Sequence, residues 1–267
     1  FLLLEVVRQS ALAILWQLRA GSFQPVGVEV RFGAGQPFPP IRLELPDGTA
    51  ALVGGKIDRV DGARAHGKEC VRIVDYKTGG REFDFAGVLN GLTLQLPLYL
   101  RAAGEGGKLR AGLYYMPVYQ PTISDAEEDL ASAVIDAFRL KGLSLSEPAV
   151  LRLGETGLDG ESSVLAGVRL GGEEAAGSVC SAREMESLLE LAVNRAERTL
   201  EEMLAGGTAA SPAARGRGKD PCRYCDYGSV CRFDPGVPGC SARRYGTIRQ
   251  KEFFELLERG GAHELDE

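Results

Sequence analysis

Apolar and polar residues alternate along the first third of the chain, and a two-residue period is typical of β-strands with one buried face. The pattern predicts strands over residues 26–32, 41–45, 51–61 and 71–76, with turns over 33–40 and 62–68. Pro46-Asp47-Gly48 is a hairpin turn signal that makes the third strand the expected partner of the second. We therefore expect a meander of three or four strands.

In much of the remaining chain, apolar residues recur at the spacing of an amphipathic helix. Helices are expected over residues 1–18, 89–102 and 247–257, with a further strand over 111–118. Ser124 and Glu127 form a capping-box pattern, which predicts a helix that runs toward Phe138.

A second capping box, Ser181 with Glu184, predicts a long helix that ends at Gly206-Gly207. Its apolar stripe is expected to be buried and consists of Met185, Leu188, Leu189, Ala192, Ala196, Leu200 and Leu204. Residues 154–177, rich in Gly, Glu and Ser without periodicity, are expected to form a variable or poorly ordered loop.

The composition is that of a globular protein, with 44% apolar residues among 267 and no apolar run of roughly 18 residues that could span a membrane. Glu5 and Arg8 interrupt the apolar start, so a secretory signal is not expected. The chain begins at Phe1 rather than Met, and we expect it to be part of a longer protein.

The formal net charge of −6 argues mildly against a nucleic-acid binder. Carboxylates that hold a metal would contribute to this charge, however, and local basic patches do the binding. Basic residues gather late in the chain, where a solvated surface is the alternative interpretation: Arg215, Arg217, Lys219, Arg223, Arg232, Arg243 and Arg244.

Three of the six cysteines, Cys222, Cys225 and Cys231, lie within ten residues, which is typical of a metal or cluster site. A structural zinc ion and a 4Fe–4S cluster both need four ligands, and Cys240 is the only other cysteine nearby. A zinc knuckle and unliganded thiols stay open as alternatives. The two remaining cysteines, Cys70 and Cys180, are expected to be ordinary buried thiols.

Two of the predicted strands each carry a carboxylate near their end, Asp58 and Asp75. Carboxylates at such positions are costly to desolvate unless a cation compensates them. Mg²⁺ prefers oxygen ligands and keeps several waters, so one oxygen from each aspartate would suit it. Lys77 follows Asp75 at the i+2 position and therefore shares its face, where an ammonium can orient a water and stabilise charge on a phosphate.

Gln95 and Tyr99 lie one helical turn apart in the next predicted helix and share one face. They could be a polar edge of a packed helix. With the two strands they look like a clamp on the lysine, on a water or on a DNA backbone. An isolated Asp-x-Lys is most often a surface pair. Here, however, it lies at the end of an apolar strand, and the strand before it in the sequence also carries an aspartate, Asp58.

These residues carry a family resemblance. Gly55-Lys56-Ile57-Asp58-Arg59-Val60-Asp61, Asp75-Tyr76-Lys77-Thr78-Gly79 and the Gln95/Tyr99 pair resemble the RecB-like branch of the PD-(D/E)xK nuclease superfamily, and within it the nuclease domains of the AddB family. Glu29 in Val28-Glu29-Val30 matches a further motif, with an exposed strand glutamate as the alternative. The resemblance covers nearly the whole chain, although neither His66 nor His263 matches a helical histidine that many relatives carry.

The resemblance implies an α/β fold in which a mixed β-sheet is flanked by helices, with a C-terminal cysteine-rich iron–sulfur segment. The expected parts are a restriction-endonuclease-like core over residues 1–205, a linker over 206–220, and the iron–sulfur segment with a C-terminal helix over 221–267. It further implies that Asp58, Asp75 and the Tyr76 carbonyl bind Mg²⁺. The other catalytic residues that it implies are Lys77, Gln95, Tyr99 and Glu29.

The same resemblance implies that Cys222, Cys225 and Cys231 bind a 4Fe–4S cluster whose fourth cysteine lies upstream of this chain. The expected function is exonucleolytic hydrolysis of DNA during double-strand-break repair, beside an AddA-like partner subunit in the bacterial cytoplasm, at the nucleoid. No Walker-type motif is present, so ATP hydrolysis would belong elsewhere.

Two other functions stay open. A free-standing iron–sulfur exonuclease is disfavoured by the expected missing start of the chain. A catalytically silent DNA-binding scaffold is disfavoured by the intact set of Asp58, Asp75 and Lys77.

Overall fold

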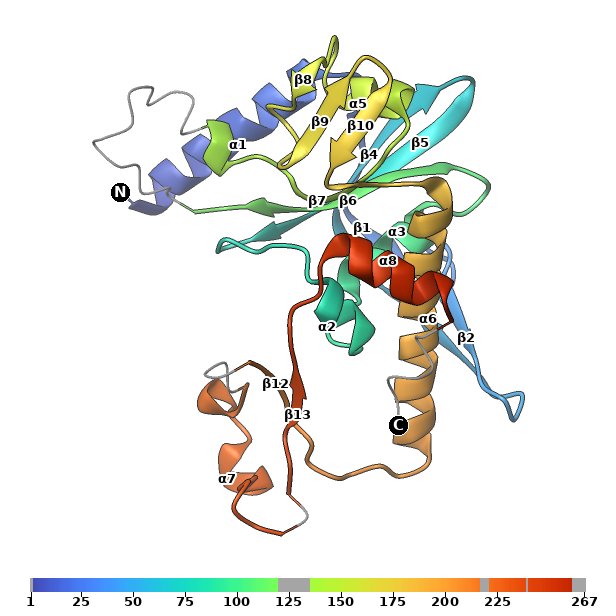
Figure 1. The fold of residues 1–267 in the computed structure, drawn as a ribbon, viewed down its shortest axis with the longest axis vertical. Coiled ribbons are helices and arrows are strands. Elements are labelled where there is room, and N and C mark those ends of the chain that lie inside the picture. Colours follow the sequence, from blue (N-terminus) through green and yellow to red (C-terminus); the bar gives the residue numbers. More distant parts are fainter. Residues whose placement is uncertain (1, 120–134, 217–220, 239, 261–267) are drawn as a thin grey trace. The chain divides into compact units, whose positions relative to one another are not determined.

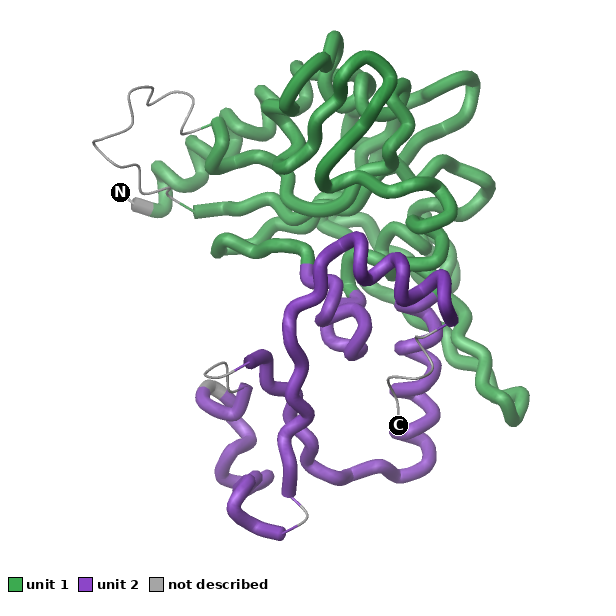
Figure 2. Tube along the Cα trace, in the orientation of Figure 1, with its two compact units in different colours: residues 1–83, 95–190 green, residues 84–94, 191–267 purple. Residues whose placement is uncertain are grey.

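The computed structural model describes residues 2–119, 135–216, 221–238 and 240–260. Contacts divide the chain into two compact units, one of residues 1–83 with 95–190 and one of residues 84–94 with 191–267 (Figure 2). The expected boundaries after residues 205 and 220 stay a prediction, because contact density does not show which segments fold independently. None of the described helices is long and apolar enough to cross a membrane.

A mixed six-stranded sheet forms the centre of the first unit, with the strand order β1-β4-β5-β6-β7-β11. Its strands are β1 (Gln24–Phe32), β4 (Gly55–Ala65), β5 (Lys68–Lys77), β6 (Leu109–Pro117), β7 (Lys141–Leu145) and β11 (Val179–Cys180). β4 pairs antiparallel with β1 and β5, whereas β6 runs parallel to β5. The expected mixed sheet is confirmed, and β4 and β5 are inner strands with neighbours on both sides.

Helices flank this sheet on both faces (Figure 1). On one face lie α1 (Leu2–Ala20), α5 (Pro148–Gly154) and a small sheet of β8 (Gly160–Glu161), β9 (Val168–Gly171) and β10 (Glu174–Gly177). Val74, Tyr114 and Met116 of the central sheet pack there in a buried apolar cluster, against Ala13 and Trp16 of α1. On the other face α3 (Gln95–Ala103) contacts β5 and β6.

The second unit holds the C-terminal elements together with α2. They are α2 (Phe85–Leu89), β12 (Ala213–Arg215), η1 (Pro221–Tyr224), α7 (Gly228–Cys231), β13 (Arg243–Tyr245) and α8 (Gln250–Glu258). The ring of Phe85 lies against Phe253 and Phe254, with centroid distances of 5.0 and 6.0 Å. α8 confirms the helix expected near residues 247–257.

The single strand expected over residues 51–61 is wrong, because the chain changes partners at Gly54. β3 (Ala50–Val53) pairs with β2 (Ile41–Glu44), whereas β4 pairs with β1 and β5. A Cβ at Gly54 would lie 3.0 Å from the Phe32 carbonyl oxygen, so any other residue there would require β1 to shift by a few tenths of an ångström.

The turn expected over residues 62–68 is shorter than predicted. β4 and β5 pair up to Ala65 and Lys68, and only His66 and Gly67 form the turn. Both have left-handed backbone, with φ of 49° and 76°, as a tight two-residue hairpin turn requires.

The single helix expected over residues 89–102 is also wrong. α2 ends at Leu89 and α3 begins at Gln95. Gly91 between them takes a left-handed φ of 72°, and the Asn90 side chain donates to the Ala86 carbonyl at 2.8 Å. Helical spacing of apolar residues continues through this break, which is why periodicity alone did not reveal it.

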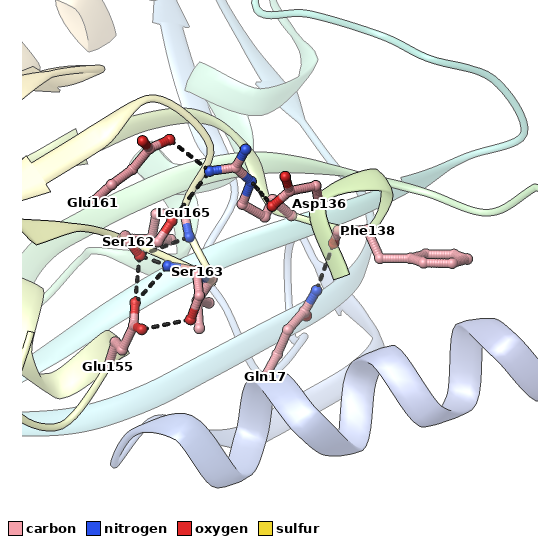
Figure 3. Close-up of polar contacts among 10 residues, drawn as sticks. Gln17, Asp136, Phe138, Glu155, Glu161, Ser162, Ser163 and Leu165 are labelled. Atoms are coloured by element: carbon pink, nitrogen blue, oxygen red, sulfur yellow. Dashed lines mark hydrogen bonds and ion pairs between the residues drawn. The ribbon is translucent and has the colours of Figure 1, made fainter. Parts of the chain in front are cut away.

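Residues 154–177 are ordered rather than a loop, which corrects the expectation from composition. α5 leads into the small sheet, and Glu155 fixes the turn between them (Figure 3). Its carboxylate accepts hydrogen bonds from Ser162 Oγ at 2.6 Å and from the Ser163 amide at 3.0 Å. Polar side chains satisfy the backbone locally, and the apolar residues of the segment join the buried cluster below: Leu158, Val164, Leu165, Val168 and Leu170.

α6 (Ala182–Leu204) confirms the long helix and its capping box. The Ser181 amide donates to Glu184 Oε2 at 2.7 Å, and the Glu184 amide donates to Ser181 Oγ at 3.2 Å. The stripe expected to be buried is buried only as far as Ala192, because Ala196 and Leu200 are half-buried and Leu204 is 61% exposed. The expected helices and strands over residues 1–18, 26–32, 71–76 and 111–118 are confirmed, whereas the Ser124 capping box lies outside the described residues.

Three charged side chains, Arg59, Asp61 and Arg72, are buried in the β4–β5 hairpin, each with at most 2% of its surface exposed. Arg59 Nη2 and Arg72 Nε donate to Asp61 Oδ2 at 3.0 and 2.9 Å. Asp61 is paired with Arg72 across the strands, and Arg59 with Val74, so all three side chains lie on the α1 face. We call this cluster the ionic triad.

We expect Asp61→Ala to lower the free energy of unfolding by about 3–5 kcal/mol, because it leaves two buried guanidinium groups without their carboxylate. Urea denaturation of the two proteins measures the difference. Glu69→Ala on the same hairpin is the control, since the Glu69–Arg64 pair at 3.4 Å is exposed, with side chains 54% and 73% accessible. A loss for Asp61→Ala no larger than that of the control would show that the triad does not stabilise the fold.

Candidate active site

Asp58 and Asp75 lie side by side where β4 and β5 separate. The last paired residues of the two strands are Arg59 and Val74, so the next position on each strand places Asp58 beside Asp75 on the same face. The Tyr76 amide donates to Asp58 Oδ2 at 3.0 Å, which links the two strand ends. The side chain of Asp58 is half-buried, and that of Asp75 is 2% exposed.

The environment of Asp75 is unfavourable for a lone carboxylate. Burial raises the pKa of Asp75, contact with the Lys77 ammonium lowers it in part, and the negative charge of Asp58 raises it further. The Lys77 ammonium forms an ion pair with Asp75 Oδ2. Two carboxylates therefore face one ammonium, and an additional cation would relieve both the desolvation and the repulsion.

Lys77 is held from the other side by α3. Its Nζ donates to Gln95 Oε1 at 3.2 Å, and Gln95 Nε2 donates to the Tyr99 hydroxyl at 3.0 Å. The Tyr99 ring meets Phe32 of β1 edge-on, with the centroids 5.7 Å apart. The sequence left three partners open for Gln95 and Tyr99: the lysine, a water and a DNA backbone. In the structure Gln95 contacts the lysine.

Glu29 lies apart from this arrangement of contacts. It sits on the edge strand β1 with a left-handed φ of 51°, which is unusual for a residue other than glycine. Its side chain is 57% exposed and forms an ion pair with Lys56 of β4. A catalytic role for Glu29 stays a prediction, and the exposed strand glutamate stays the alternative.

The sequence did not predict that the side chains of Arg59 and Tyr76 contact each other behind the candidate site. Arg59 Nη1 donates to the Tyr76 hydroxyl at 3.2 Å, which joins the ionic triad to the residue between Asp75 and Lys77. The signal was present, since charged residues at every second position of an apolar strand are either exposed or paired. Without the strand pairing, their partners could not be identified.

The donor set suits a hard divalent cation. Asp58, Asp75 and the Tyr76 carbonyl are oxygen ligands of the kind that Mg²⁺ uses, and Mg²⁺ commonly takes only one or two carboxylates and keeps waters. Within the residues that the structure describes, no three His, Cys, Asp or Glu side chains gather as a metal-binding group. A site with only two carboxylates is compatible with that finding. A cluster held by four thiolates would instead require four cysteines to lie close together.

The cysteine segment lies in the second unit and is not gathered into such a group. The Cys225 amide donates to the Cys222 carbonyl at 3.2 Å in the turn after η1, and Cys231 ends α7. The thiols of Cys225 and Cys231 are exposed. The expected iron–sulfur part of the fold is therefore not shown by the described residues. Cys70 and Cys180, in contrast, are buried, and burial raises the pKa of both thiols.

Comparison with known proteins identifies relatives of this chain. Relatives named as the B subunit of an ATP-dependent helicase/deoxyribonuclease are 31% identical in Clostridium acetobutylicum, 34% in Moorella thermoacetica and 35% in Desulforudis audaxviator. These matches cover 98%, 95% and 98% of this chain and 24%, 23% and 23% of the relatives. The chain thus spans about a quarter of the length of the curated relatives that it matches.

The family model of the PD-(D/E)XK nuclease superfamily matches residues 3–232. That range includes the whole central sheet and both strand ends that carry Asp58 and Asp75. The chain belongs to the PD-(D/E)XK nuclease superfamily.

Proposed function

We propose that this chain hydrolyses phosphodiester bonds in DNA as the nuclease domain of the B subunit of a helicase–deoxyribonuclease. The observation that carries the proposal is the pair of adjacent strand ends, where Asp58 and Asp75 share a face and Lys77 is ion-paired with Asp75. The names and identities of the relatives support DNA as the substrate. An AddA-like partner subunit and a role in DNA-end processing at the bacterial nucleoid belong to the same proposal.

In this proposal Asp58, Asp75 and the Tyr76 carbonyl hold Mg²⁺, which supplies Lewis-acid polarisation of the scissile phosphate and of water. The ammonium of Lys77 lies against Asp75 and offsets part of the rise in its pKa that burial causes, which favours the charged carboxylate that a metal ion needs. Lys77 in turn orients the attacking water and stabilises the charge that develops on the phosphate. Gln95 and Tyr99 restrict the position of Lys77 through the hydrogen bonds at 3.2 and 3.0 Å.

A catalytically silent scaffold would have no need for this arrangement. A buried aspartate with a raised pKa lowers stability when ionised, and a binding surface gains nothing from it. Perturbed carboxylates of this kind are typical of reactive sites.

We also propose that Cys222, Cys225 and Cys231 bind a 4Fe–4S cluster, with Cys240 or a cysteine outside the given sequence as the fourth ligand. What supports this is their spacing in the sequence and the turn that brings the Cys225 amide to the Cys222 carbonyl. Its function would be structural, because a cluster whose irons are all held by thiolates leaves no open ligand position for a substrate.

We expect Asp75→Asn to abolish Mg²⁺-dependent cleavage, with a loss of roughly 10³-fold or more, because a neutral amide cannot replace the carboxylate. Cleavage of end-labelled DNA is measured beside circular dichroism, which reports whether the variant is folded. Glu69→Gln on the same strand is the control and should cleave as the wild type does, since Glu69 is exposed at the opposite end of β5. Full activity of a folded Asp75→Asn protein would refute the assignment.

Lys77→Ala should lower the cleavage rate by roughly 10²–10³-fold, the scale for losing one preorganised donor to the transition state. DNA affinity should change little, because many phosphate contacts share it. Single-turnover cleavage and equilibrium DNA binding separate the two effects, with Lys68→Ala on the same strand as the control. If binding collapses while bound DNA is still cleaved normally, Lys77 anchors DNA rather than taking part in the reaction.

Alkylation mapping at pH 8 tests the cysteine proposal. Cys70 and Cys180 should resist iodoacetamide in the folded protein, because burial raises the pKa of both thiols and leaves little thiolate. In anaerobically purified full-length protein, Cys222, Cys225 and Cys231 should be protected as well, with about four iron atoms per chain. One zinc ion per chain would favour the knuckle, and reactive thiols without metal would remove the cluster from the proposal.

A further inference from the structure

We propose that the Tyr76 side chain and Arg59 are positioning residues that hold the Asp75–Lys77 strand end in the geometry needed to bind a divalent cation. The inference rests on the proposed function, since it concerns the same site. The proposal assigns a role to the hydrogen bond between Arg59 and the Tyr76 hydroxyl, which the proposed function does not use.

Tyr76 lies between Asp75 and Lys77 and points to the opposite face of β5, because side chains alternate along a strand. On that face it packs against the buried cluster that contains Val74 and Met116. Its hydroxyl therefore does not face the site where a phosphate would bind. Any influence of this side chain on the reaction must act through the backbone.

The backbone of Tyr76 is linked to both proposed aspartate ligands, to Asp58 by a hydrogen bond and to Asp75 by the peptide bond. Its amide donates to Asp58 Oδ2 at 3.0 Å, and its neighbour in the chain is Asp75. Its carbonyl is the third proposed ligand. A displacement of this one peptide would change the spacing between all three oxygen donors, and metal sites of Mg²⁺ tolerate little deviation from octahedral geometry.

Ordinary strand pairing does not hold Tyr76 on the β4 side. The paired residues of β4 and β5 end at Arg59 and Val74, two positions before Tyr76 on β5. Pairing with β6 continues, since Tyr76 is paired with Met116. On the β4 side the restraints are the bond from the Tyr76 amide to Asp58 and the bond at 3.2 Å from Arg59 Nη1 to the Tyr76 hydroxyl.

Arg59 is a rigid anchor for this purpose. It is 2% exposed, and its guanidinium donates to Asp61 Oδ2 at 3.0 Å and lies 6.0 Å from the centroid of the Tyr76 ring. Asp61 is fixed in turn by Arg72 at 2.9 Å. A buried guanidinium that is bonded to a fixed carboxylate has few alternative positions, so it restrains the hydroxyl that it contacts.

The test compares Tyr76→Phe with Tyr114→Phe in the full chain. Each substitution removes one hydroxyl and keeps the ring. Tyr114 is the matched control, because it lies on the same face of the next strand and its hydroxyl bonds to Ser144 Oγ at 2.8 Å, away from the proposed ligands. A purely structural effect of losing a hydroxyl should therefore be seen in both variants.

Binding of Mn²⁺, measured by the loss of the free-ion EPR signal, is the first readout and needs no catalysis. Tyr76→Phe should weaken Mn²⁺ binding by roughly tenfold, the scale for residues that support metal ligands, whereas Tyr114→Phe should bind it as the wild type does. In cleavage assays, Tyr76→Phe should need more Mg²⁺ for half-maximal rate, with the rate at saturating Mg²⁺ within about twofold of the wild type.

Equal Mn²⁺ affinity of Tyr76→Phe and the wild type would overturn the positioning role. So would equal weakening in both tyrosine variants, because the effect would then be one of general stability. Asp75→Asn is included to keep the proposed function distinct. A wild type that binds Mn²⁺ no better than Asp75→Asn would overturn the metal site itself and the positioning role with it.

Discussion

The burial of Asp61 between Arg59 and Arg72 is the constraint on which the rest of the first unit depends. Three charges with at most 2% exposure are tolerable only while the carboxylate contacts both guanidinium groups. Asp61 is paired across the strands with Arg72, so a shift of the hairpin by one residue would turn these side chains to opposite faces and separate them. The triad therefore selects one register, and the two-residue turn at His66 and Gly67 is compatible with it.

The register of this hairpin brings Asp58 beside Asp75. The two aspartates are the first unpaired positions beyond Arg59 and Val74, so any alternative register would move one of them away from the other or onto the α1 face. Lys77 shares the face of Asp75 for the same reason, and α3 then reaches it through Gln95 at 3.2 Å. A stability element on one face of the hairpin thus determines the geometry of the candidate site on the other.

The strand ends were predictable because each of their features is local. A carboxylate near one end of an apolar strand, and an aspartate two residues before a lysine, can be recognised from neighbouring residues, although Asp58 lies near the start of β4 rather than at the end of a strand. The partner change at Gly54, the break at Gly91 and the order of residues 154–177 depend on contacts between distant segments or on local polar bonds such as those of Glu155. Hydrophobic periodicity contains none of that information, and the pairing that joins Arg72 to Asp61 is likewise absent from it.

The two charged clusters on the faces of the hairpin have opposite net charges. Asp58, Asp75 and Lys77 leave one net negative charge on the site face, whereas the triad leaves one net positive charge on the α1 face. The charges that act on Asp75 lie nearer to it: Lys77 and Arg81 lower its pKa, and Asp58 raises it. Burial and repulsion still leave the pKa of Asp75 raised, so compensation is incomplete. That residual imbalance is what a divalent cation would relieve, and it explains why a fold can keep a costly carboxylate pair on two of its inner strands.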